Sequence, residues 1–140
     1  SAHKEDDAKR LGANNFLLSS DKDAMKAARY SFDLIINTVS AKIDIDRYLS
    51  LLTLDGTMVM VGVPEEPLSL RTFSMIIARR SLAGSNIGGI KETQEMLDFC
   101  AEHGFGSDVE IIDAQDINTA WDRVVNSDVK YRFVIDTSTI

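Results

Sequence analysis

Short apolar runs alternate along this chain with longer segments of helical spacing. In the run Met58–Val63 the first four residues are all apolar, whereas a strand with one exposed face would alternate apolar and polar side chains. We therefore expect this strand to be covered on both faces, and the same holds for Phe32–Ile36. The other predicted strands are Phe16–Leu18, Leu82–Ala83, Val109–Ile112 and Phe133–Ile135.

The segments between these runs repeat apolar residues at intervals of three and four, as amphipathic helices do. One predicted helix covers Ile45–Leu52, with Asp44 placed to cap it and Asp55–Gly56 placed to end it. Two others end at Gly12 and Gly104, since glycine readily adopts the left-handed conformation that closes a helix. The helix that ends at Gly104 covers Met96–Ala101, and further helices are expected over Leu70–Ile77 and Ile117–Val124. Strands alternating with helices at this spacing predict a doubly wound α/β fold with a parallel sheet.

Composition narrows the possible partners. The chain has 140 residues, with 15 basic and 22 acidic side chains and a net charge of −7. This charge argues against nucleic acid or an anionic membrane as a partner, since both favour a surplus of Lys and Arg. No apolar run approaches the roughly 20 residues of a membrane span, and the opening residues do not resemble a signal peptide. The single Cys100 excludes an intramolecular disulfide and fits a reducing compartment, so we expect a cytoplasmic protein without a structural zinc cluster.

Small and polar residues follow three of the predicted strands. They form the segments Asn37–Ser40, Val61–Pro64 and Ser85–Gly89. In parallel α/β sheets ligands bind beyond the carboxyl ends of the strands, and a glycine there allows a flat ligand to approach the backbone. The residues alone leave two readings open, a ligand site or ordinary turns.

Five segments of the chain, in order, resemble the zinc-containing medium-chain alcohol dehydrogenases. Within that family they are most similar to the NADP-dependent branch that includes the cinnamyl alcohol dehydrogenases. The segments are Asp33–Val39, Asp55–Pro64, Arg79–Gly89, Glu92–His103 and Asp128–Asp136.

The resemblance implies that the chain corresponds to the C-terminal part of such an enzyme. We therefore expect a partial Rossmann sheet that lacks its first strands, followed by a strand–helix–strand segment from the catalytic domain. The implied domains are residues 1–105, a partial dinucleotide-binding domain, and residues 106–140, the segment that returns to the catalytic domain. The glycine-rich phosphate-binding pattern G-x-G-x-x-G does not occur after any predicted strand, and no catalytic or metal-ligating residue is expected here.

The resemblance also assigns the first residues to the cofactor. Ser1 and Lys4 match the family segment that meets the adenosine 2′-phosphate. A dianionic phosphate needs a hydroxyl and a cation, whereas a free ribose hydroxyl favours a carboxylate. No acidic residue precedes Glu5, so NADP is expected rather than NAD. The alternative is a solvated terminus.

Four further groups are implied to contact NADP. Thr38 and Val39 would lie near the adenosine half and the pyrophosphate. Val61, Gly62 and Val63 would line the nicotinamide side, and the backbone of Ser85, Asn86 and Ile87 would hold the carboxamide. Arg132 would bind the pyrophosphate, because a guanidinium pairs with two phosphate oxygens at once; the alternative is a surface arginine beside Lys130.

The implied function is that of an alcohol dehydrogenase or aldehyde reductase. The parent enzyme would use zinc and NADP to transfer hydride between the nicotinamide and a primary alcohol or aldehyde, and this chain alone would be inactive. The alternative from a different class is a self-standing α/β module for ligand binding or regulation, without catalysis.

Two expectations concern the edges of the sheet. The segment Leu82–Gly89 has neither charge nor proline, so its free edge would pair with a second copy in a homodimer. Losing the central strands would leave Phe16–Leu18 with no neighbour and Phe32–Ile36 with one open side. We expect these two strands to pair directly, or another copy to fill the gap, rather than the first thirty or so residues to lose their packing. Weak NADP binding by this chain would follow from the same loss.

Overall fold

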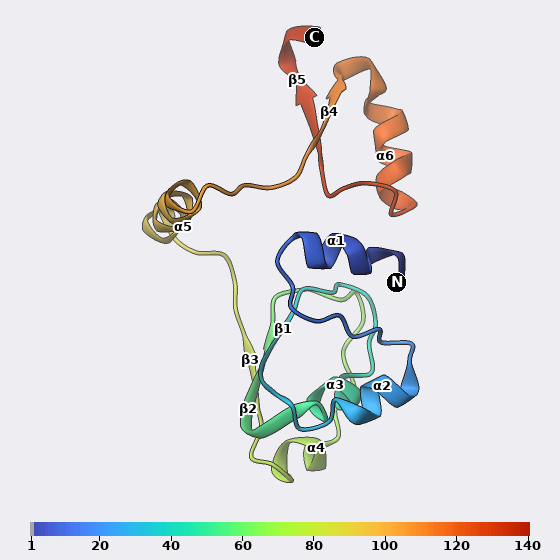
Figure 1. Cartoon of the computed structure of the whole chain (residues 1–140), viewed down its shortest axis with the longest axis vertical. Coiled ribbons are helices and arrows are strands. Elements are labelled where there is room, and N and C mark those ends of the chain that lie inside the picture. Colours follow the sequence, from blue (N-terminus) through green and yellow to red (C-terminus); the bar gives the residue numbers. More distant parts are fainter. Residues whose placement is uncertain (1) are drawn as a thin grey trace. The chain divides into compact units, whose positions relative to one another are not determined.

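The computed structural model describes residues 2–140, and these divide into two compact units (Figure 1). The first unit ends at Ile87 and the second comprises Gly88–Ile140. Both are mixed α/β structures whose strands run parallel, which confirms the predicted fold class. Among residues 2–140, no helix combines the length and the apolar character needed to cross a bilayer.

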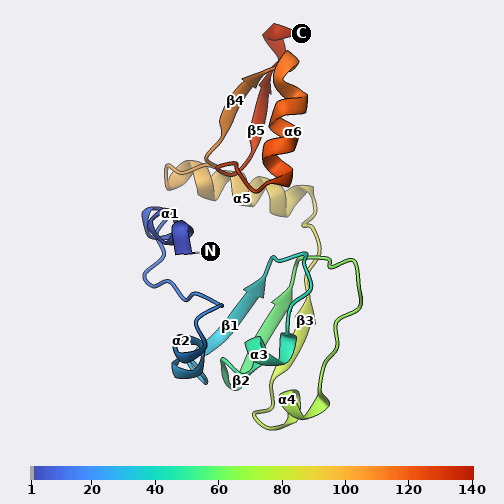
Figure 2. The ribbon, with the colours of Figure 1, turned by 90° about the vertical axis from the view of Figure 1, so that its right-hand side faces the viewer.

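The first unit contains a three-stranded sheet in the order β1-β2-β3. Its strands are β1 (Phe32–Asn37), β2 (Leu52–Met60) and β3 (Ser81–Gly84), and they run side by side in the same direction (Figure 2). The short helices of the unit are η1 (Ala2–Lys4), α1 (Glu5–Arg10), α2 (Lys22–Ala27), α3 (Ile45–Leu49) and α4 (Thr72–Ile76).

Local sequence signals begin and end several of these helices. The Asp21 carboxylate accepts hydrogen bonds from the backbone N–H groups of Asp23 and Ala24, which satisfies donors that the first turn of α2 leaves free. Asp44 caps α3 in the same way, through the N–H of Arg47 at 3.3 Å. Gly12 follows α1 with a φ of 101°, a conformation that favours glycine. The predicted caps at Asp44 and Gly12 are therefore confirmed.

The core of the first unit lies between α3 and β2. Ile45 and Leu49 of α3 are buried against Leu52 and Met58 of β2. Each of these side chains is at most 1% exposed, and burying one stabilises the fold by about 1.5–3 kcal/mol. This packing fixes α3 on the sheet and thereby holds the carboxyl end of β2 in place.

The second unit consists of α5 (Ile90–Glu102), β4 (Glu110–Asp113), η2 (Ala114–Asp116), α6 (Ile117–Val125), β5 (Phe133–Asp136) and η3 (Thr137–Thr139). Strands β4 and β5 pair in parallel, and α6 runs beside them (Figure 2). Helix α5 is followed by Gly104 at a φ of 67°, as its sequence predicts.

The prediction for Phe16–Leu18 is wrong. These residues are not in a strand, and β1 pairs only with β2 among the described residues. Direct pairing of Phe16–Leu18 with β1 is therefore contradicted. Leu17 instead contributes to a cavity of about 270 Å³ beside β1. A three-residue apolar run has no strand geometry of its own, because a strand forms only where a neighbour accepts its backbone hydrogen bonds.

The expected burial of β1 on both faces is also wrong for this chain. Leu34 and Ile36 are 56% and 60% exposed, although Asn37 at the end of the strand is buried. The apolar residues of β1 favour burial of both faces of the strand. No element among residues 2–140 covers the face that carries Leu34 and Ile36.

The predicted end of the α3 helix is wrong as well. The helix ends at Leu49, and Asp55–Gly56 lies inside β2 rather than after a helix. The pairing of β1 with β2 shifts register there, between Phe32 and Leu34. Asp55 has a φ of 61°, and its N–H donates to the carbonyl of Ala78. The two turn-forming residues therefore make an irregularity in the strand.

Candidate functional site

A cavity of about 820 Å³ opens at the carboxyl ends of β2 and β3. Five of the predicted cofactor residues line it: Val61, Gly62, Val63, Ser85 and Asn86. The remaining wall is formed by Met60, Gly84 and the loop from Pro64 to Leu68. The structure thus brings together residues separated by more than twenty positions in the sequence, at the edge where parallel sheets bind ligands.

Backbone hydrogen bonds tie the three strand ends together at this cavity. The Asn37 carbonyl at the end of β1 accepts from the N–H groups of Val61 and Gly62, at 2.9 and 3.0 Å. On the other side of β2, the Ser85 N–H donates to the Met60 carbonyl at 3.0 Å. These bonds continue the parallel ladder past the last residue of β2 and fix the path of the cavity wall.

Gly62 is required by close packing between two loops. A Cβ atom placed on Gly62 would lie 2.4 Å from the carbonyl oxygen of Val39 and 2.8 Å from the carbonyl carbon of Thr38. Both distances are shorter than any ordinary contact, so only glycine fits here without a backbone shift. Thr38 and Val39 do not line the cavity themselves, but they lie directly behind its Gly62 wall.

The side chain of Asn37 supports the same loop. Asn37 is 7% exposed, and its Oδ1 atom accepts from the Val39 N–H at 3.2 Å while its amide donates to the Met60 sulfur at 3.6 Å. No specific contact was predicted for Asn37 beyond its place in the segment Asn37–Ser40. A signal was present, since Asn37 follows the apolar residues Leu34–Ile36, and asparagine side chains often bond to the nearby backbone.

The chemistry of the cavity suits one flat face of a ring better than it suits a phosphate. Met60, Val61 and Val63 provide apolar wall, and Gly84 leaves open space where a side chain would otherwise stand. The charged residues of the lining are the carboxylates Glu65 and Glu66, of which Glu66 pairs with Lys42 at 3.2 Å. Carboxylates repel phosphate, whereas they tolerate a neutral or cationic ring.

The other predicted site residues do not line this cavity. Lys4 is exposed in η1, and Ile87 is 90% exposed just beyond the cavity wall. Arg132 lies in the second unit, directly before β5. Ser1 is outside the described residues. The cofactor contacts assigned to these four residues stay predictions, as do those assigned to the residues at the cavity.

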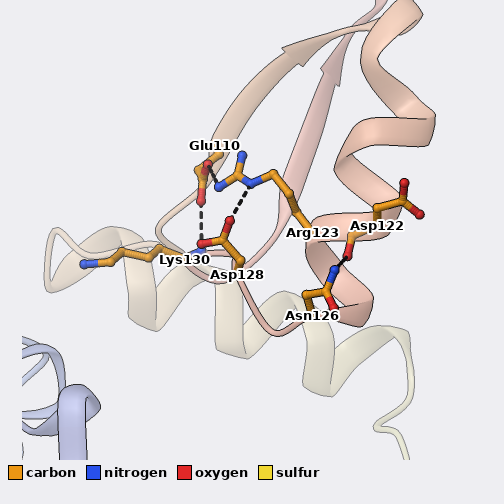
Figure 3. Close-up of polar contacts among 6 residues, drawn as sticks. All are labelled: Glu110, Asp122, Arg123, Asn126, Asp128 and Lys130. Atoms are coloured by element: carbon orange, nitrogen blue, oxygen red, sulfur yellow. Dashed lines mark hydrogen bonds and ion pairs between the residues drawn. The ribbon is translucent and has the colours of Figure 1, made fainter.

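Polar contacts hold the segment that carries Arg132 (Figure 3). The Glu110 carboxylate accepts from the Lys130 N–H at 2.9 Å and from the Arg123 guanidinium at 2.8 Å. Arg123 also donates to Asp128 at 3.1 Å, and the Glu110 N–H donates to the Arg132 carbonyl at 3.0 Å. Together these bonds fasten residues 128–132 to β4 and α6.

The same contacts shift two ionisation equilibria. The hydrogen bond from the Lys130 N–H, followed by that from Arg123, holds the pKa of the Glu110 carboxyl below its ordinary value. The carboxylates of Glu110 and Asp128 raise the pKa of Arg123 above its ordinary value. All these groups are accessible to water. The network therefore holds residues 128–132 in place at the surface and is not a buried charge cluster.

No group of three or more His, Cys, Asp or Glu side chains among residues 2–140 is arranged to hold a metal ion. The described residues therefore do not fit zinc. They do fit the ring end of a dinucleotide, through the apolar wall, the open space at Gly84 and the close approach at Gly62.

Comparison with known proteins decides the family. The family model described as zinc-binding dehydrogenase matches residues 1–102. The chain belongs to the zinc-binding dehydrogenase family. It is 53% identical to an NADP-dependent alcohol dehydrogenase C of Mycobacterium tuberculosis over 140 residues, which is all of this chain and 40% of the relative.

Solved structures of this dehydrogenase family share the fold. A cinnamyl alcohol dehydrogenase of Sorghum bicolor matches with a TM-score of 0.94 at 44% identity, over 99% of this chain and 39% of that one. A cinnamyl alcohol dehydrogenase of Helicobacter pylori complexed with NADP(H) matches with a TM-score of 0.83 at 37% identity and the same coverage. These matches confirm the predicted resemblance and the partial Rossmann-type sheet. The chain spans about 40% of the length of the relatives it matches.

Proposed function

We propose that this chain forms the nicotinamide-facing part of an NADP-dependent alcohol dehydrogenase or aldehyde reductase. The observation that carries the proposal is the cavity at the ends of β2 and β3, where Val61, Gly62, Val63, Ser85 and Asn86 converge. Family membership supplies the class of chemistry, and relatives named as NADP-dependent support the choice of cofactor.

Each group at the cavity has a role in this proposal. Val61 and Val63 pack against one face of the nicotinamide ring and keep water from it. Gly62 allows the loop after β1 to pass close behind the ring, and backbone groups of Ser85, Asn86 and Ile87 orient the carboxamide. When bound, NADP supplies the nicotinamide that gives or takes the hydride of a primary alcohol or aldehyde.

The phosphates are assigned to other residues of the chain. Lys4 and Ser1 would meet the adenosine 2′-phosphate, and Thr38 and Val39 would lie near the pyrophosphate. Arg132 would pair with the pyrophosphate oxygens, and the Glu110–Arg123 contacts would hold its segment in place. In domain terms, we assign residues 1–105 to the dinucleotide-binding domain and 106–140 to the segment that returns to the catalytic domain.

Zinc would be held by residues outside this chain, since the described residues provide no metal site. The 140-residue chain is accordingly proposed to be inactive by itself. An assay of the chain with NADPH and an aromatic aldehyde, with and without added zinc, checks this. No turnover is expected, and clear turnover would contradict the assignment of the metal to another part of the enzyme.

The cofactor preference can be tested in the protein encoded by the complete reading frame around these residues. Lys4→Glu places a carboxylate where the 2′-phosphate is expected, so it should raise the KM for NADPH by at least about tenfold while leaving the KM for NADH nearly unchanged. Lys91→Glu makes the same charge change on α5 and serves as the control. Equal effects of the two variants would refute the assignment of Lys4.

We also propose a homodimer that forms through Leu82–Gly89. Strand β3 pairs only with β2 among residues 2–140, and Leu82 and Ile87 on this segment are exposed. Ile87→Lys adds a charge at this edge and should yield a monomer in light scattering at micromolar concentration. Ile140→Lys, at a position that is 91% exposed in the other unit, should leave the dimer intact. A wild-type monomer would contradict the proposal.

We also propose a cytoplasmic location for the enzyme, because the single cysteine of this chain fits a reducing compartment.

A further inference from the structure

A second cavity in the first unit is rich in positive charge. It has a volume of about 390 Å³ and is lined by Lys22, Met25, Lys26, Arg29, Arg47 and Ser50. Four of the six lining residues are cations and none is a carboxylate. It shares no residue with the cavity at the ends of β2 and β3.

The elements of the first unit converge to form this cavity. Lys22 and Lys26 lie one turn apart on α2, so their side chains share a face of the helix, and Arg29 follows the end of α2. Arg47 comes from α3, whose packing on β2 is fixed by the core. Met25 is 4% exposed and contributes an apolar side chain to the lining of this open cavity.

Among the described carboxylates close to these cations in sequence, Asp21 and Asp46 are engaged elsewhere, and Asp23, which adjoins Lys22, forms no ion pair with any of the four. Asp21 accepts from the N–H groups that begin α2, and Asp46 accepts from the Arg71 N–H at 3.2 Å and lies 4.0 Å from the Arg71 guanidinium. Within residues 2–140, no ion pair neutralises any of the four cations of the cavity. Four uncompensated cations around one hollow repel each other, and an anion with several charges relieves that repulsion.

We propose that the α2–α3 cavity binds a small anion with two adjacent phosphate groups. Each guanidinium can pair with two phosphate oxygens, while the lysines act as point charges. A volume of about 390 Å³ suits a small ligand. A long nucleic acid is disfavoured because the net charge of −7 repels an extended polyanion outside this local cluster. Free pyrophosphate and the diphosphate of a nucleotide share the chemistry that the cavity recognises.

Isothermal titration calorimetry of the full chain with pyrophosphate tests the proposal. The double variant Lys26→Gln/Arg47→Gln removes one cation from each wall, and it should weaken binding by roughly tenfold or more, as expected for charge-assisted hydrogen bonds. Lys42→Gln/Lys91→Gln is the matched control, because it makes the same charge change at exposed positions outside the cavity. Its affinity should stay within about twofold of the wild type, by screening in water.

Additional variants and measurements ensure that each outcome either supports or contradicts the proposal. Circular dichroism establishes that each variant folds, and Lys22→Gln/Arg29→Gln replaces the first double variant if that one does not. Arg132→Gln should have no effect, and a loss of pyrophosphate affinity there would place the anion at the predicted cofactor site and overturn the proposal. No pyrophosphate binding, or equal weakening in the test and control variants, would also overturn it. ADP identifies the source: binding that exceeds pyrophosphate and falls in the same variant supports a nucleotide diphosphate, and weaker binding supports free pyrophosphate.

Discussion

Gly62 and Val39 approach so closely that no side chain fits between their backbones. A Cβ atom at Gly62 would lie 2.4 Å from the Val39 carbonyl oxygen. The Asn37 carbonyl, which accepts from the Gly62 N–H at 3.0 Å, holds the glycine in that position. The loop after β1 and the loop after β2 are therefore a single packed unit, and the predicted cofactor residues of both loops depend on it.

Gly62→Ala should destabilise the first unit by about 1–3 kcal/mol, because the added methyl group forces one loop away from the other. Thermal unfolding measures the change. Gly84→Ala is the control at the opposite wall of the same cavity, where an added Cβ meets nothing within 4 Å. If both variants unfold at the same temperature, the close approach does not determine the choice of glycine.

Asn37→Leu should cost about 1–3 kcal/mol, since it removes the acceptor of the Val39 N–H at a position that is 7% exposed. Denaturant unfolding gives the free energy, and hydrogen exchange of the Val39 amide should become faster. Asn86→Leu changes an exposed asparagine at the same end of the sheet, and there we expect a change within about 0.5 kcal/mol. Unchanged protection of the Val39 amide in Asn37→Leu would argue against the side-chain bond.

Arg80→Met should destabilise the first unit by about 1–3 kcal/mol, because it removes the side-chain donor of three hydrogen bonds to backbone carbonyls at a buried position. Arg80 is 6% exposed, and its guanidinium donates to the carbonyls of Leu52 and Ser74 and stacks on Tyr30 at 4.9 Å. Arg79→Met is the neighbouring control. It breaks only an ion pair with Asp55 in water, so its melting temperature should be close to that of the wild type. The reverse order of the two variants would contradict this account.

Glu110→Gln should make the stability of the second unit less dependent on pH in the acid range. The pKa of Glu110 is lowered in the folded state, so the unfolded chain takes up a proton at a pH where the folded chain does not. The stabilisation is present above the ordinary glutamate pKa and is lost as pH falls through the lowered one. The difference in melting temperature between wild type and variant should therefore be largest near neutral pH and shrink on acidification.

Glu95→Gln is the matched control for this experiment. Glu95 pairs with Lys91 one turn away on α5, and both side chains are well exposed. Its difference from the wild type should be small at every pH. A difference for Glu110→Gln that grows as pH falls would have the wrong sign for a carboxyl whose pKa is lowered by folding.

Local sequence signals were sufficient where a structure depends on its own neighbours along the chain. Asp44 caps α3 through the Arg47 N–H, and Gly12 and Gly104 end helices in the left-handed conformation, as predicted. The apolar runs in β1, β2 and β3 were also predicted as strands, because consecutive apolar residues favour burial in a sheet. The family segments, being contiguous, also identified the class of protein from the sequence alone.

The tertiary structure decided what depends on a partner distant in sequence. Phe16–Leu18 is apolar enough for a strand but has no neighbour to complete its hydrogen bonds, so it does not form one. The sequence Asp55–Gly56 is typical of a helix end. These residues lie in β2 instead, because the Asp55 N–H donates to the carbonyl of Ala78. Arg79 and Arg80 are adjacent cations that follow α4 in the sequence. Folding separates them, because the Arg80 side chain is buried and donates to the carbonyls of Leu52 and Ser74, whereas the exposed Arg79 side chain pairs with Asp55.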